Sequence, residues 1–256
     1  MRRRSQSESP WGPSQKAQDK QFPQLKLNHI APNFHALSSH GPIELYEYLS
    51  THPEPYNPDE TTKATANATD GATKGGSWVV FFSYPMDSTL ACTTEVASMA
   101  ELQGEFAKRG AKLLGLTIGT VEQHRDWMRE IRKFIEAGGT HREKNLLNFP
   151  IIADEDGYVS QLYGMLEDPG EATEVEHLRT VRSLFVIDPN RHIRLITAYP
   201  DTTGGDTAEI LRALDALKRS DQAGVLTPEG WTVGDEIVVP PEMTHEDAEK
   251  KFGKGR

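Results

Sequence analysis

The sequence has a single cysteine, Cys92, among its 256 residues. One cysteine cannot form a disulfide within the chain, and it cannot supply the several thiolates of a structural zinc site. Long apolar runs are missing as well: the longest, at residues 78–82, is much too short to span a bilayer. The N-terminus lacks the apolar core of a secretory signal peptide, which favours an intracellular and reducing compartment.

Positive charge is also scarce, with 28 Lys and Arg against 38 Asp and Glu, for a formal net charge of -10. This balance argues against a protein-wide basic surface, so we expect neither nucleic acid nor a membrane as a partner. The basic residues 2–4 resemble a mitochondrial address, but Glu8 and Asp19 count against it because transit peptides are poor in acids. We therefore expect a cytoplasmic protein, with the mitochondrion as the alternative.

Two segments have too few apolar residues to order themselves. Residues 1–24 are predicted to be a disordered tail, and residues 51–76 a flexible insertion rich in Thr, Asn, Ala, Pro and Gly. The main domain is expected at residues 25–220. After residues 227–228 the chain becomes Pro-rich and then charged, which predicts a small C-terminal extension with short strands, placed at residues 221–256.

Strand and helix patterns alternate along the main domain. An apolar run and short β-rich segments predict strands, and a 3.6-residue period predicts helices. The predicted strands are 78–82, 113–118, 149–152 and a hairpin of 183–187 with 193–198, and the predicted helices are 91–109, 121–136 and 208–219. This order predicts an α/β fold with a central mixed sheet flanked by helices.

Cys92 follows the segment that joins the first buried strand to the first long helix. Asp87, Ser88 and Thr89 can all cap a helix, so Cys92 is expected within the first helical turn. Free backbone N–H groups and the positive end of the helix dipole favour a thiolate there. The residues alone leave two interpretations open, a nucleophile or a small buried hydrophobe, which is the usual role of a free cysteine.

A family resemblance decides between them. Pro85, Thr89 and Cys92 reproduce the Pro-x3-Thr-x2-Cys signature of peroxiredoxins, and the continuation Thr-Thr-Glu is similar to the one-cysteine subfamily. Further similarity to the family lies at residues 31–34 (APNF), 199–204 (YPDTTG) and 227–236 (TPEGWTVGDE). The resemblance implies a thioredoxin-like domain followed by a C-terminal extension domain that helps to form a homodimer.

The resemblance also implies a thiol peroxidase that reduces hydrogen peroxide and organic hydroperoxides without a cofactor or a metal. Cys92 would attack the terminal peroxide oxygen and become a sulfenic acid. Thr89 would direct its hydroxyl at sulfur and peroxide, and Arg182 would stabilise the thiolate and the charge that develops on the peroxide. Pro85 would shield the pocket without offering an N–H, and Glu95 would hold the arginine in place.

The single cysteine also determines how the oxidised enzyme would be reduced. No second cysteine can condense with the sulfenic acid, so an external thiol, glutathione or a thioredoxin-type protein, would have to reduce it.

Three residues near the motif differ from the family pattern. Tyr84 stands where many one-cysteine relatives have His, and Ser88 and Leu90 replace Phe and Pro within the motif. These changes alter the pocket wall and leave the thiol, hydroxyl and guanidinium in place.

Other activities fit the sequence less well. A thiol–disulfide oxidoreductase needs a second nearby cysteine, and a cysteine hydrolase needs a recognisable histidine base. Some one-cysteine relatives also hydrolyse phospholipids through a Ser/His/Asp set. Ser77 matches the serine, but Tyr46 and Asn190 occupy the other two positions, so we expect no phospholipase activity. A holdase-type chaperone activity stays open as a second function.

Overall fold

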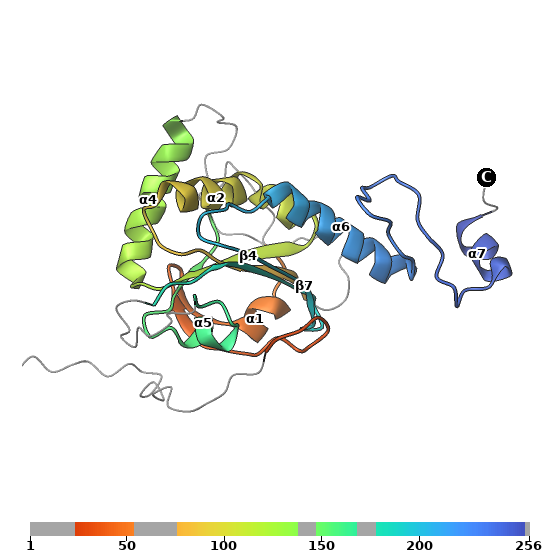
Figure 1. Cartoon of the computed structure of the whole chain (residues 1–256), viewed down its shortest axis with the longest axis horizontal. Helices are drawn as coiled ribbons and strands as arrows, with labels where there is room; N and C mark the ends of the chain where they lie inside the picture. The colour runs from red at the N-terminus through yellow and green to blue at the C-terminus, as the bar shows by residue number, and fades with distance from the viewer. Residues whose placement is uncertain (1–23, 54–75, 138–146, 168–177, 254–256) are drawn as a thin grey trace, which may run out of the picture.

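The computed structural model describes residues 24–53, 76–137, 147–167 and 178–253. Its centre is a seven-stranded mixed sheet with helices on both faces (Figure 1). The strands are β1 (His35–Ser38), β2 (Gly41–Glu44), β3 (Trp78–Ser83), β4 (Ala111–Thr117), β5 (Ile151–Ala153), β6 (Arg182–Ile187) and β7 (Ile193–Tyr199), in the order β2-β1-β5-β4-β3-β6-β7. The helices are α1 (Leu45–Ser50), α2 (Leu90–Glu101), α3 (Gln103–Lys108), α4 (Val121–Ala137), α5 (Tyr158–Leu162), α6 (Thr207–Ala223) and α7 (His245–Phe252).

The two central strands explain the apolar run in the sequence. Strand β3 pairs in parallel with β4 and antiparallel with β6, and every residue of β3 and β4 is buried. Helices cover both faces of these strands, so neither face needs polar side chains. The predicted α/β fold with a mixed central sheet is confirmed, and so is the hairpin, formed by β6 and β7.

The alternation of side chains along β3 divides the interior into two cores. Trp78, Val80 and Phe82 face α2, α4 and α6, whereas Val79 and Phe81 face α1 and α5. Figure 1 shows these two helical layers above and below the sheet. Cys92 belongs to the first core, so its sulfur lies within the packed interior beside the sheet and not on an open loop.

Two local predictions were wrong. The helix expected at 91–109 is interrupted at Leu102, whose φ of -96° and ψ of 4° lie outside the helical region. The break is two residues before Gly104, the weakest helix former of the segment, and it still lets Met99 and Phe106 enter the same core. In the described part of the C-terminal extension, an isolated bridge between Leu226 and Val238 and the helix α7 replace the expected short strands.

The predicted tail and insertion fall mostly outside the described residues, at 1–23 and 54–75. Helix α6 continues to Ala223, past the residue at which the extension was expected to start, and ends at Gly224 in a left-handed conformation. The chain then leads away from the sheet (Figure 1). Its anchor is Trp231, which is buried and whose carbonyl accepts a hydrogen bond from Arg212. No helix in the described ranges is both long and apolar enough to cross a membrane.

Lys112 is a charged residue placed inside this fold. It lies on β4, its ammonium donates to the carbonyl of Tyr48 and to Oγ1 of Thr51, and it sits over the Tyr48 ring. Burial lowers the pKa of Lys112 to about 8. The neutral acceptors stabilise the ammonium less than water does, which is why the folded chain releases this proton early.

We expect the pKa of Lys112 to appear as a pH-dependent stability. An unfolded lysine keeps its proton up to a pH of about 10.4. Between that value and about 8 the unfolded chain binds more protons than the folded chain, so stability rises with pH. From pH about 7.5 to about 9.5 the urea unfolding free energy should rise by about 2 kcal/mol more in the wild type than in Lys112→Met. Parallel profiles of the two proteins would contradict this assignment.

Candidate active site

Cys92 is the third residue of helix α2. Thr89 caps the helix, and its Oγ1 accepts a hydrogen bond of 3.3 Å from the backbone N–H of Cys92. Ser88, at a φ of 62°, turns the chain into the helix through the left-handed region. The predicted place of Cys92 in the first helical turn is therefore confirmed, and its side chain is fully buried. Backbone N–H groups and the helix dipole favour negative charge on a sulfur placed there.

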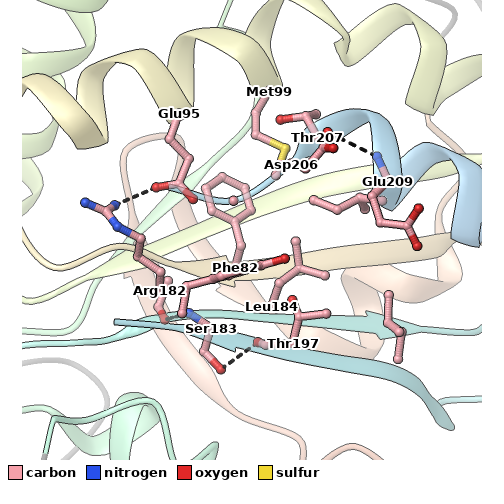
Figure 2. Close-up of a pocket in the computed structure, with 15 residues that line it drawn as sticks. Phe82, Glu95, Met99, Arg182, Ser183, Leu184, Thr197, Asp206, Thr207 and Glu209 are labelled. Carbon is pink, nitrogen blue, oxygen red and sulfur yellow. Dashed lines mark hydrogen bonds and ion pairs between the residues drawn. The ribbon is translucent and has the colours of Figure 1, made fainter. Parts of the chain in front are cut away.

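The guanidinium of Arg182 reaches this sulfur from the sheet. Arg182 is the first residue of β6, and its Nη1 lies 3.4 Å from the Sγ of Cys92 and 2.6 Å from Oε2 of Glu95. Its Nη2 donates to the carbonyl of Asp201, 3.0 Å away. Acceptors from α2 and from the segment after β7 thus fix the planar fork, and Figure 2 shows Arg182 and Glu95 pointing toward each other. The expected pairing of Glu95 with an arginine is present in the structure.

Burial strengthens the attraction between the charges of Arg182 and Glu95 and changes the pKa of the carboxylate. The side chains of Arg182 and Glu95 are 3% and 14% exposed, so water screens their attraction weakly. Burial raises the pKa of Glu95, and the guanidinium of Arg182 and the backbone amide of Gly205 oppose that rise. The Nε of Arg182 is buried with no hydrogen-bond partner among the described residues. A cation held in this way can stabilise an anionic sulfur beside the same Nη1 that contacts Glu95.

Pro85 shares the segment between β3 and α2 with Thr89. It lies two residues after the end of β3 and is half-buried. Because proline has no backbone N–H, it adds an apolar wall without a donor. Of the four predicted catalytic residues, the structure brings Cys92, Thr89 and Arg182 into contact and places Pro85 in the adjoining turn.

A buried polar network beneath this turn was not predicted. The hydroxyl of Tyr84 donates to Oδ1 of Asp87 at 3.1 Å, and Nδ1 of His124 donates to Oδ2 of the same carboxylate at 2.6 Å. Tyr84 and His124 are fully buried. Asp87 therefore ties the turn that carries Pro85 to Tyr84, the residue after β3, and to helix α4. No sequence pattern indicated this network, because His124 lies 37 residues after Asp87 and belongs to no motif.

The residues of the rival hydrolytic set have structural partners instead. Ser77 is buried and its hydroxyl donates to the carbonyl of Thr51 at 2.6 Å. The hydroxyl of Tyr46 donates to the carbonyl of Ala31 at 2.9 Å. A tyrosine hydroxyl that is engaged in this way cannot take the proton of Ser77 as a histidine base would. Among the described residues, no group of three or more His, Cys, Asp and Glu side chains is arranged to hold a metal ion.

Comparisons with known proteins agree on one family. Residues 57–196 match the family described as AhpC/TSA, and residues 216–255 match the C-terminal domain of 1-Cys peroxiredoxin. The chain is 40% identical over 233 residues to the mitochondrial peroxiredoxin PRX1 of Saccharomyces cerevisiae, covering 91% of this chain and 77% of that protein. It is 36% identical over 231 residues to human peroxiredoxin-6, covering 90% of each.

Solved structures agree in fold. A structure of yeast mitochondrial 1-Cys peroxiredoxin, concerned with its thiol-resolving mechanism through the glutathione and thioredoxin systems, has a TM-score of 0.70 and 36% identity, covering 90% of this chain and 94% of that one. A cysteine-to-serine mutant of peroxiredoxin 6 from Arenicola marina has a TM-score of 0.72 and 32% identity, with 89% of each chain covered.

Removing the carboxylate of Asp87 should cost stability, because His124 and Tyr84 would then be buried without their acceptor. We expect Asp87→Ala to lower the free energy of unfolding by about 2 kcal/mol. Asp87→Asn, which keeps one acceptor oxygen, should cost less. Met86→Ala, at an exposed neighbouring position, is the control and should stay within about 0.5 kcal/mol of wild type. Equal stability of Asp87→Ala and Met86→Ala in urea titrations would show that the network contributes nothing.

Proposed function

This chain belongs to the one-cysteine peroxiredoxins, which are thiol peroxidases, and we propose that Cys92 is the peroxidatic nucleophile. The observation that carries the proposal is the guanidinium of Arg182, 3.4 Å from the sulfur of a cysteine at a helix N-terminus. Both features favour the thiolate, which is the reactive form. Glu95 and the carbonyl of Asp201 hold the guanidinium, so it is ordered before a peroxide arrives.

The reaction we propose is a two-electron displacement on oxygen. The thiolate of Cys92 attacks the terminal oxygen of the hydroperoxide, the S–O bond forms, and the O–O bond breaks. Sulfur ends as a sulfenic acid, and the leaving alkoxide or hydroxide takes up a proton and departs as an alcohol or water. Arg182 donates hydrogen bonds to the oxygens as charge moves onto the leaving group.

Thr89 and Pro85 shape the space around the sulfur. Thr89 accepts the N–H of Cys92 through its Oγ1, which leaves its own hydroxyl proton available for the sulfur or for a peroxide oxygen. Pro85 adds an apolar wall that withholds water from the sulfenic acid. Because Cys92 is fully buried, a bulky thiol can reach the sulfenic acid only after the first turn of α2 has opened.

Recycling by an external thiol follows from the sequence, which offers no second cysteine to form an internal disulfide. We propose glutathione or a thioredoxin-type protein as the reductant. The yeast mitochondrial relative supports this choice, since its structure concerns resolution through both systems. Hydrogen peroxide and organic hydroperoxides are the proposed oxidising substrates.

We propose a homodimer of chains with a peroxiredoxin domain at 25–220 and an extension at 221–256. The two separate family matches support this division. The extension exposes Leu226, Val233 and Val238, with Val233 73% exposed, and a second copy would cover such apolar surface.

For the compartment we propose the cytoplasm, with the mitochondrion as the alternative that the mitochondrial yeast relative supports. Imaging of a C-terminally tagged chain decides between the two.

The roles of the site residues can be tested in single-turnover kinetics with hydrogen peroxide. Cys92→Ser should abolish the reaction, and Arg182→Met should lower the second-order rate constant by about 10²-fold, the loss typical of a removed oxyanion donor. Arg179→Met removes an exposed arginine close in sequence and should stay within about twofold of wild type. Equal rates for the two arginine variants would remove Arg182 from the mechanism.

Without added thiol, each chain should complete only one rapid turnover, because the sulfenic acid is not reduced back to the thiol. At stoichiometric peroxide, intact mass spectrometry should show oxygen added to a monomeric chain, with sulfinic acid accumulating as peroxide is raised. Addition of glutathione, or of thioredoxin with its reductase, should restore turnover. A disulfide-linked pair of chains as the dominant product would overturn the mechanism, because the sulfenic acid would then have a resolving partner in a second Cys92.

A further inference from the structure

The turn that leads into the cysteine helix has little to hold it in place by itself. Residues 85–89 join β3 to α2, and much of the segment faces solvent, with Met86 45% and Leu90 74% exposed. Ser88 is exposed and has a φ of 62°, in a region that residues other than glycine disfavour. A segment with few buried apolar contacts opens readily. The closed position of this turn therefore depends on side-chain anchors.

Tyr84 is a fixed point directly before the turn. Its backbone N–H donates to the carbonyl of Leu116 at 3.3 Å, which continues the pairing of β3 with β4. Its carbonyl accepts a hydrogen bond of 2.5 Å from the hydroxyl of Thr180. The ring is buried against Trp127 of α4, with 5.1 Å between the ring centroids. Backbone and ring together thus fix the position of the Tyr84 hydroxyl.

This hydroxyl reaches forward to the middle of the turn. It donates to Oδ1 of Asp87 at 3.1 Å, while Nδ1 of His124 contacts Oδ2 at 2.6 Å. Burial raises the pKa of Tyr84 well above its ordinary value, and the carboxylate of Asp87 and the sulfur of Cys92 add to the rise. The phenol therefore keeps its proton and remains a donor to Asp87 at neutral pH.

The second anchor of Asp87 requires a close fit on α4. His124 is fully buried, and a Cβ at Gly119 would lie 2.8 Å from its Cε1. Gly119 also has a φ of 152°, so a glycine serves both the backbone and the available space. The start of α2 lies beside α4 (Figure 1). The carboxylate of Asp87 thus joins the exposed turn to the packed core on two sides.

We propose that Tyr84 is a positioning residue: its hydroxyl, through Asp87, keeps the first turn of α2 closed over Cys92 and so limits the rate at which an external thiol reaches the sulfenic acid. The inference rests on the proposed role of Cys92. Because Cys92 is fully buried in the closed site, a thiol as large as glutathione reacts only from the open one.

The two fates of the sulfenic acid differ in the space that they need. With glutathione, the thiol sulfur bonds to the sulfur of Cys92, the S–O bond breaks, and hydroxide leaves with the thiol proton as water. With a second hydrogen peroxide, a new S–O bond forms, the O–O bond breaks, and the products are a sulfinic acid and water. Only the first reaction needs the turn to open, so the Tyr84 hydroxyl determines how the sulfenic acid is divided between them.

Two tyrosine variants separate a local effect from a general one. Tyr84→Phe removes the hydroxyl and keeps the ring in the core. Tyr163→Phe is the matched control, because Tyr163 is also buried and its hydroxyl donates to the carbonyl of Pro32 at 2.6 Å. Tyr163 lies in the core on the other face of the sheet. A general loss of stability would affect both variants alike, whereas a looser turn would appear only in Tyr84→Phe.

The test measures two rate constants of the full-length protein. Protein oxidised with stoichiometric hydrogen peroxide is mixed with glutathione, and the mixed disulfide is followed by intact mass spectrometry. Tyr84→Phe should raise this rate constant about fivefold, the scale of one hydrogen bond lost from the closed state. Oxidation of the reduced protein by hydrogen peroxide should stay within about twofold, because the closed state still predominates. An unchanged reaction with glutathione, or an equal gain in Tyr163→Phe, would overturn the proposal.

A double variant tests the route through Asp87. Once Asp87→Ala has removed the acceptor, adding Tyr84→Phe should not raise the rate constant with glutathione any further. A further rise of about fivefold in the double variant would show that the hydroxyl acts elsewhere, and this would overturn the proposal.

Hydrogen exchange of the reduced protein measures the opening without any redox chemistry. A peptide covering residues 85–95 should exchange about fivefold faster in Tyr84→Phe than in the wild type, and a peptide from α6 should exchange equally in both. Equal exchange at residues 85–95 would overturn the proposal and leave the peroxidase assignment intact. Faster exchange together with a wild type that shows no Cys92-dependent reaction with peroxide would instead contradict the proposed function, and with it the role given to the Tyr84 hydroxyl.

Discussion

The site depends on one buried cation. Moving the guanidinium of Arg182 into the protein costs solvation, and the structure offsets this cost only through close acceptors. Glu95 supplies the charge, the carbonyl of Asp201 supplies a second acceptor, and the sulfur of Cys92 lies 3.4 Å from the same fork. Two of these partners come from the beginning of α2 and the third from the segment after β7. Their positions relative to β6 are therefore coupled, because a shift of Glu95 would leave the buried guanidinium without its counter-ion and a shift of either other partner would remove an acceptor.

The sulfur itself is positioned by local structure and by a second polar network. Thr89 fixes the first turn of α2 through its hydroxyl, while Asp87 fixes the preceding turn through Tyr84 and His124. The first contact lies within four residues and depends only on cap chemistry. The second joins the segment after β3 to α4, so it forms only when that segment and the helix pack together. Stability of the core and geometry of the cysteine are thus linked through one carboxylate.

The sequence predicted well what short segments determine by themselves. The apolar run at β3 has no alternating polar residues, which predicts a buried strand, and the capping residues before Cys92 predict the start of a helix. Both elements could therefore be predicted from local propensity and pattern. Arg182 could be assigned only through the family resemblance, because 90 residues separate it from Cys92 and no local pattern distinguishes it from a surface cation. The strands β1 and β2 are four residues each and carry too short a pattern to be found.

Arg182 has a different environment at each of its nitrogens, and this determines where the guanidinium can act. Its Nη1 contacts the sulfur of Cys92 and the carboxylate of Glu95, and its Nη2 donates to the carbonyl of Asp201. Its Nε is buried without a hydrogen-bond partner among the described residues. Because acceptors of the protein itself hold both terminal nitrogens, the guanidinium stays beside the sulfur without the help of a bound substrate.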